Sequence, residues 1–208
     1  MVITLSNPKP LHIYPAATIL WGPRAEGIGT LIALVILGIG LAGFAVGNLF
    51  YTGLWYDESV QFWISRGLSP FAPPLSDPGS LLDVGKYNRL FNLDPGGFSL
   101  LLFFWSAVGT DIAWLRLLPF LFFILGLGCF GLLVYSWTRS RLISLLCISM
   151  LFWFDLILYH SVEVRAYSME FAGTMLILYL TRIALLRLSR RTFFILGLVA
   201  ALFMTSVS

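Results

Sequence analysis

Charged side chains are scarce in this sequence, and their scarcity excludes a water-soluble globular domain. Only 11% of the 208 residues are charged, whereas 59% are hydrophobic, and the mean hydropathy is +0.90. Soluble domains carry about 25% charged residues because their surfaces face water. Cysteine is rare as well. Cys129 and Cys147 both fall inside apolar runs, so we expect buried free thiols rather than a disulfide.

The first 27 residues lack the features of a cleaved signal peptide. Lys9 and Arg24 stand among scattered prolines, with no short apolar core and no small-residue cleavage site. We therefore expect the following apolar run to be retained as a membrane anchor and residues 1–27 to form a cytoplasmic segment.

Long apolar runs, in contrast, are abundant, and they predict an all-α polytopic membrane protein. A helix needs ~20 apolar residues to cross a bilayer. Five strong runs cover residues 28–50, 114–137, 142–159, 167–186 and 193–208, and a weaker run covers residues 98–108. We expect about five transmembrane helices plus an external juxtamembrane helix. The last run is short and ends with the sequence, so we expect the transmembrane module, residues 28–208, to be incomplete at its C-terminus.

The distribution of basic residues favours a topology in which the run 98–108 does not cross. In that topology eight basic residues and one acid, Glu26, share one side of the membrane. If the run crossed, the arginines at 139–141 and at 187–191 would lie opposite Lys9 and Arg24. The positive-inside rule therefore predicts a cytoplasmic N-terminus and an external loop over residues 51–113 that contains interfacial helices.

This topology gathers acids and arginines at the external end of the bundle. Asp57 and Glu58 follow the first run directly, and the turn 160–167 between the third and fourth runs lies at the same level. Asp155 and Glu170 fall about one helical turn inside the membrane, where charge is costly. A lipid-borne phosphate fits such a place, because arginine binds phosphate through a planar fork and a carboxylate can accept a proton from an attacking hydroxyl.

Four landmarks in the same order carry a family resemblance. They are the steps Trp55 to Glu58 after the first run, Asp94 to Phe98 before the weak run, Leu115 to Pro119 in the second run, and Glu163 to Tyr167 before the fourth run. This order resembles the N-terminal part of the C-type glycosyltransferases, which use polyprenyl-phosphate sugars. The nearest likeness is to the protein O-mannosyltransferases and the lipid A aminoarabinose transferases with their bacterial relatives. The chain departs from the family pattern at Gly96, Gly97 and Ala166, where prolines are usual.

The resemblance implies a role for each residue of the site. Asp57 would be the general base that deprotonates the acceptor hydroxyl, and Glu58 would orient the acceptor or hold a cation. Arg165 would bind the donor phosphate. The other residues implied in substrate binding are Asp94 near the acceptor, Arg116 assisting with phosphate or tying the second span to the loop, and Glu163 and Tyr167 beside Arg165.

The implied reaction is a single inverting displacement on the external face of the cell membrane, in bacteria the inner membrane. The expected partners are a polyprenyl-phosphate-linked sugar, a lipid, glycan or protein acceptor, and membrane lipids, with no nucleic acid. No full set of metal ligands is visible around His160 and Glu163, and a divalent cation is left open as a cofactor.

Structural explanations compete with each role. Asp57 and Glu58 could simply cap a helix over residues 58–64, because acids are favoured at helix starts. Arg165 could pair with Glu163 or Glu170. For the whole chain the alternative is a non-catalytic membrane protein, such as a small transporter or an assembly subunit. A transporter should show polar groups at the midplane, internal repeats or broken helices.

Overall fold

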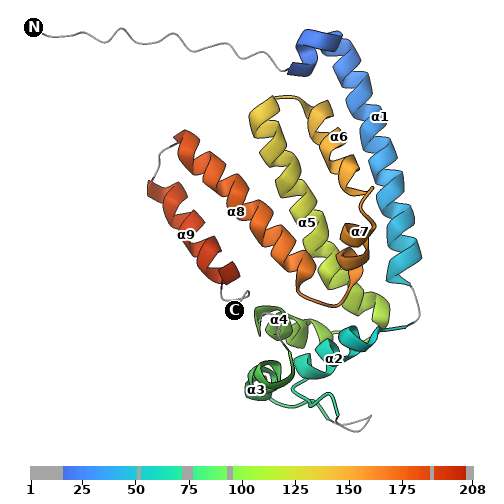
Figure 1. Cartoon of the computed structure of the whole chain (residues 1–208), viewed down its shortest axis with the longest axis vertical. Coiled ribbons are helices and arrows are strands. Elements are labelled where there is room, and N and C mark those ends of the chain that lie inside the picture. The colour runs from blue at the N-terminus through green and yellow to red at the C-terminus, as the bar shows by residue number, and fades with distance from the viewer. Residues whose placement is uncertain (1–15, 51–52, 72–76, 93–95, 188–189, 205–208) are drawn as a thin grey trace, which may run out of the picture.

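The computed structural model describes residues 16–50, 53–71, 77–92, 96–187 and 190–204, and within these ranges the regular structure is entirely helical (Figure 1). The helices are α1 Ala16–Leu49, α2 Tyr56–Ser65, α3 Leu81–Phe91, α4 Gly96–Ser106, α5 Ile112–Thr138, α6 Arg141–Leu151, α7 Asp155–Val162, α8 Tyr167–Arg187 and α9 Arg190–Met204. The prediction of an all-α fold is confirmed.

The number of membrane spans is smaller than the sequence predicts. Three helices in the described ranges are long and apolar enough to cross a bilayer: α5, Ala25–Leu49 of α1, and Tyr167–Leu186 of α8. The run 142–159 is interrupted, because α6 and α7 meet at an angle of 82° and make a fourth span only if the bent pair is counted as one. The run 193–208 lies mostly in α9, whose 15 residues are too few for a crossing. The expectation of about five spans is therefore wrong for the described residues.

The helices define two ends of the molecule. In Figure 1, α1, α5, α6 and α8 lie side by side, and α2, α3 and α4 gather below them. We call the end formed by α2–α4 the loop end, and the opposite end, which contains the turn between α5 and α6, the turn end. The weak run 98–108 forms α4, a short apolar helix at the loop end. This placement agrees with the predicted non-crossing topology, whereas the side of the membrane stays a prediction.

A close contact between α5 and α8 forms the centre of the bundle. A Cβ on Gly126 of α5 would meet the Phe171 ring of α8 and would lie 3.2 Å from the Cα of Ala172. On another face of α5, a Cβ on Gly131 would be 2.7 Å from Cδ1 of Ile148 in α6. Small residues let helix backbones approach closely in membranes, where dispersion contacts rather than water exclusion hold helices together.

Buried hydrogen bonds join the three helices of the loop end. The Gln61 amide of α2 donates to the Ser99 hydroxyl of α4 (2.8 Å), which donates to the Asn88 side chain of α3 (2.6 Å). Asn92 also donates to the Gln61 carbonyl. Because buried polar groups are costly without partners, this network fixes how α2, α3 and α4 meet.

The start of α3 is capped and tied to the end of α2. The Asp83 carboxylate accepts hydrogen bonds from the hydroxyl and the backbone N–H of Ser80, at 2.6 and 2.9 Å. These bonds hold the pKa of Asp83 below its ordinary value. Gly67, at a φ of 68°, and Gly79 bring the two backbones together, and the Gly79 N–H donates to the Arg66 carbonyl (2.8 Å). The left-handed φ is one that glycine adopts without steric cost.

Two stacked tryptophans close the turn from α4 to α5. The rings of Trp105 and Trp114 lie 4.3 Å apart and nearly parallel. Each indole N–H donates to the backbone carbonyl of the other residue, at 2.8 and 3.0 Å. The pair fixes the start of α5, and therefore the position of Arg116, relative to α4.

Candidate functional site

The structure brings six of the seven predicted site residues together at the loop end. Asp57 and Glu58 lie in the first turn of α2, Arg116 lies in the first turns of α5, and Glu163, Arg165 and Tyr167 lie where α7 passes into α8. Hydrogen bonds connect α2 to both other segments. The seventh residue, Asp94, lies outside the described residues.

Glu58 and Arg116 form a buried ion pair. Their side chains are 1% and 5% exposed, and the Arg116 Nη2 donates to the Glu58 Oε2 at 2.9 Å. The Glu58 carboxylate also accepts hydrogen bonds from Arg116 Nε (3.3 Å) and from the backbone N–H groups of Trp55 (2.9 Å) and Val164 (3.0 Å). Four donors therefore satisfy the charge that burial has removed from water.

The same pair fastens the first span to the second. Arg116 donates to the backbone carbonyls of Asn48, near the end of α1, and Gly53, in the following loop, at 3.2 and 2.6 Å. These contacts fit the interpretation of Arg116 as a residue that ties the second span to the loop through an acid. Glu58 also caps α2 through the Trp55 N–H, as the structural interpretation of that residue expects.

Asp57 makes a second and more exposed ion pair. The Nη1 of Arg165 donates to the Oδ2 of Asp57 at 3.2 Å, and the two side chains are 18% and 60% exposed, Arg165 being the less exposed. The guanidinium also lies over the Tyr167 ring, 5.1 Å from its centroid, a distance typical of a cation–π contact. The sequence suggested Glu163 or Glu170 as a partner of Arg165, and the structure shows an ion pair of Arg165 with Asp57.

Glu163 is held by histidine rather than by an arginine in this arrangement. The Nδ1 of His160 lies 2.5 Å from the Oε2 of Glu163, and its ring lies 4.4 Å from that of Tyr167. The Ser168 hydroxyl donates to the His160 carbonyl at 2.9 Å. This set orients the turn that carries Arg165.

A small cavity of about 70 Å³ lies beside the buried Glu58–Arg116 pair. Asn48, Trp55 and Tyr159 line it together with Glu58, Arg116, Val162 and Glu163. The sequence placed Trp55 in the step that follows the first run, and it gave no signal for Asn48 or Tyr159, because each lies at the end of an apolar run with no motif around it.

The described residues contain no group of three or more His, Cys, Asp or Glu side chains that could hold a metal ion. The cation that the sequence left open is therefore not supported by a ligand set in those parts of the chain.

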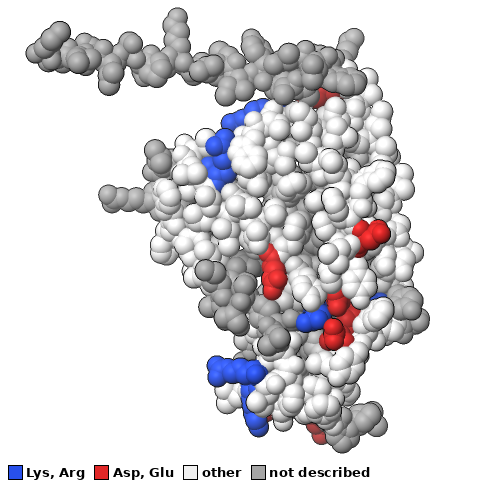
Figure 2. Space-filling model, in the orientation of Figure 1, with Lys and Arg blue, Asp and Glu red and all other residues white. Residues whose placement is uncertain are grey.

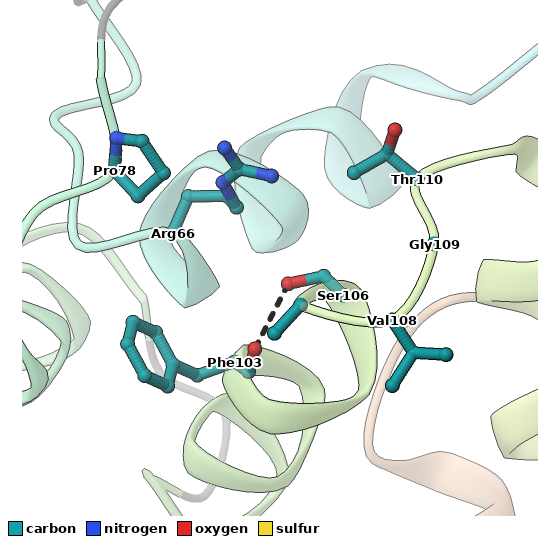
Figure 3. A pocket seen from close by; sticks show the side chains of 8 residues that line it. Arg66, Pro78, Phe103, Ser106, Val108, Gly109 and Thr110 are labelled. Atoms are coloured by element: carbon teal, nitrogen blue, oxygen red, sulfur yellow. Dashed lines mark hydrogen bonds between the residues drawn. The ribbon is translucent and has the colours of Figure 1, made fainter.

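A larger crevice opens at the other end of α2 (Figure 3). It measures about 420 Å³, and Arg66 reaches over it from the end of α2. Ser106 and Thr110 bring hydroxyl groups from the α4–α5 connection. The Ser106 hydroxyl donates to the Phe103 carbonyl at 3.1 Å. Asp57 and Arg66 are nine residues apart along a helix that rises ~1.5 Å per residue, so ~14 Å separates this crevice from the exposed pair.

The charged side chains on the surface gather toward the two ends of the molecule. In Figure 2, acidic and basic side chains lie close together toward the loop end, and basic side chains gather near the turn end. Between them the drawn face is uncharged except for two separate acidic patches, and uncharged surface is what contact with lipid tails requires.

Compared with known proteins, the chain matches no family model, no curated protein and no solved structure. The family resemblance therefore rests on the sequence motifs alone.

Proposed function

We propose that this chain is a membrane glycosyltransferase, or the N-terminal part of one, that moves a sugar from a polyprenyl-phosphate carrier to an acceptor hydroxyl. The observation that carries the proposal is the ion pair between Asp57 and Arg165, which join from segments 108 residues apart at one end of an apolar bundle. The membrane-facing bundle suits a lipid-linked donor, and the exposed Asp57 side chain suits a water-borne or interfacial acceptor.

The two side chains divide the chemistry between them. Asp57 accepts the proton of the acceptor hydroxyl as its oxygen attacks the anomeric carbon of the sugar. The bond from that carbon to the phosphate oxygen breaks, and the configuration inverts. Polyprenyl phosphate leaves with the bonding electrons, and Arg165 balances its charge through a planar guanidinium. The Tyr167 ring packs against that guanidinium and holds it in place.

Glu58 and Arg116 act differently in this proposal from what the family resemblance implies. All four hydrogen bonds described for Glu58 come from protein donors, and its side chain is 1% exposed. We therefore assign Glu58 and Arg116 to positioning: they fix the first turn of α2, and so Asp57, against the turn that carries Arg165.

A second candidate, a small transporter, is favoured by one observation. The α6–α7 pair is bent by 82°, and broken helices are typical of transporters. Asp155 begins α7 at this break and is exposed. In a transporter, Asp57 and Arg165 would serve only to hold α2 against the 163–166 turn.

The proposal is tested by substituting Asp57 with Asn. The full chain is reconstituted in vesicles with native membrane extract as acceptor and a panel of polyprenyl-phosphate sugars as donors, and release of polyprenyl phosphate is measured. Loss of a general base is expected to lower the rate by at least ~100-fold. The matched control is Asp111→Asn, because Asp111 is an exposed acid at the same end and makes no side-chain capping bond.

Two results would count against the proposal. One is transfer by Asp57→Asn at the rate of the Asp111→Asn control. The other is an unchanged chain that releases no polyprenyl phosphate from any donor while its fold, judged by circular dichroism and monodispersity, is intact.

A further inference from the structure

A groove at the turn end has features that the proposed transferase does not use. It lies between α1, α5 and α6 and measures about 390 Å³. Its walls are mainly apolar, with Leu34 of α1, Leu132 of α5, and Leu145 and Ile148 of α6. Leu34 and Leu132 are about half exposed.

Glycine spacing on α5 explains the hollow. Gly131 allows α6 to come close, since a Cβ there would be 2.7 Å from Cδ1 of Ile148. Gly128, three residues earlier, also lines the groove, but a Cβ there would have nothing within 4 Å. The helices therefore touch at Gly131, and beside Gly128 a space is left that a slender apolar chain can enter.

The groove continues into a more polar hollow of about 320 Å³. The two share Thr30, Tyr135 and Arg141, and the second adds Arg139 and Glu26. Arg139 takes a left-handed φ of 55° at the end of α5, and Arg141 begins α6. Both side chains are exposed, and neither has a hydrogen-bond or ion-pair partner among the described residues.

The charge at this hollow is positive on balance. Glu26 is the acid that lines it, and that carboxylate accepts a hydrogen bond from the Ser140 hydroxyl at 2.8 Å. The two guanidinium groups therefore outnumber the carboxylate. The N-terminus of α6 starts here as well, and a helix N-terminus adds a partial positive charge.

We propose that the groove binds one anionic phospholipid, with an acyl chain along Leu132 and Gly128 and the phosphate against Arg139 and Arg141. The two parts of the site match the two parts of such a lipid. A zwitterionic lipid offers the same tail but loses most of the attraction to two arginines. The arginine forks suit a phosphate that has little water around it. This inference does not depend on the proposed transfer reaction.

Native mass spectrometry of the purified chain tests the proposal. The chain is incubated with equal amounts of phosphatidylglycerol and phosphatidylcholine, and the two bound populations are compared. With two arginines at the headgroup, phosphatidylglycerol is expected to be preferred by roughly ten-fold. The double variant Arg139→Gln/Arg141→Gln should abolish the preference. The control Arg89→Gln/Arg191→Gln removes the same charge from exposed positions outside the groove and should keep the preference.

Filling the apolar part separates the tail from the headgroup. Gly128→Leu should lower the binding of both lipids without changing their ratio. Leu34→Trp, on the opposite wall, provides the same test if Gly128→Leu does not fold. No preference in the unchanged chain, a preference that survives loss of both arginines, or unchanged binding after the groove is filled would each overturn the proposal.

Discussion

Asp57 and Glu58 are neighbours in the sequence and lie in different environments. Successive residues in a helix point about 100° apart, so when Glu58 turns inward to Arg116, Asp57 is left at the surface beside Arg165. The sequence located the acidic step and its two arginines, but it could not say which acid would meet which arginine. That choice depends on where α5 and the 163–166 turn pack, which no local pattern encodes.

Replacing Glu58 with Gln is expected to destabilise the protein by about 3 kcal/mol or more, because it leaves Arg116 as a buried charge without a charged partner. The new amide would also present hydrogens to groups that are themselves donors. The measurement is the midpoint of unfolding in detergent micelles.

The matched control for that measurement is Asp57→Asn. Its ion pair is exposed on the aspartate side, so its loss is expected to change stability by about 1 kcal/mol or less. Equal destabilisation by the two variants would contradict the structural role assigned to Glu58.

At the level of the helices, the sequence predicted most apolar elements and missed one break. The runs 114–137 and 167–186 became α5 and α8 with boundaries close to those expected. The run 142–159 bends by 82° near Phe154, although it contains no proline or glycine. Phe154 adopts an extended backbone (φ −105°, ψ 99°), and the exposed residues there, Trp153 and Phe154, are as apolar as their neighbours. The polar sign at the break is Asp155, the charged residue that begins α7 and that the sequence marked as costly inside the membrane.

Gly126→Ala is expected to loosen the contact between α5 and α8. A methyl group there would overlap the Phe171 ring and press on the Ala172 backbone, and overpacking of this kind costs about 1–3 kcal/mol. The unfolding midpoint in micelles is again the measurement.

Gly128→Ala is the companion variant, in the same helix and two residues away. A Cβ there would meet nothing within 4 Å, so the variant should be neutral or stabilised by up to ~1 kcal/mol through helix propensity. If Gly126→Ala and Gly128→Ala had the same unfolding midpoint, the close approach of α5 to α8 would not be what makes Gly126 necessary.

For the whole molecule, the sequence separated the basic residues at 139–141 from the acidic end and overestimated the number of spans, whereas the side of the membrane stays a prediction. The turn between α5 and α6, which carries the basic residues at 139–141, lies at the opposite end from α2, which carries Asp57 (Figure 1). The expected fifth span does not reach the necessary length in the described residues, because α9 has 15 residues. Apolar composition alone could not distinguish a crossing helix from a shorter one packed along α8.

Labelling of single cysteines can establish which end faces the cytoplasm. In a background with Cys129 and Cys147 replaced by Ser, a cysteine at Asp83 should react with a membrane-impermeant maleimide added to intact cells, because α3 is at the loop end. A cysteine at Arg139 should react only after the membrane is permeabilised. Reaction of both positions from the same side would contradict the topology, and exchanged reactivity would place the proposed site in the cytoplasm.

The stacked indoles of Trp105 and Trp114 have a consequence for spectroscopy. Two indole rings this close couple electronically, and any twist between their in-plane transition directions gives a paired positive and negative band in circular dichroism. The coupling requires the two rings to stay at this short distance, and Trp105 belongs to α4 whereas Trp114 belongs to α5. The chain thus carries its own optical signal for the closed α4–α5 turn, readable in a lipid bilayer without a label and lost as soon as the short helix swings away.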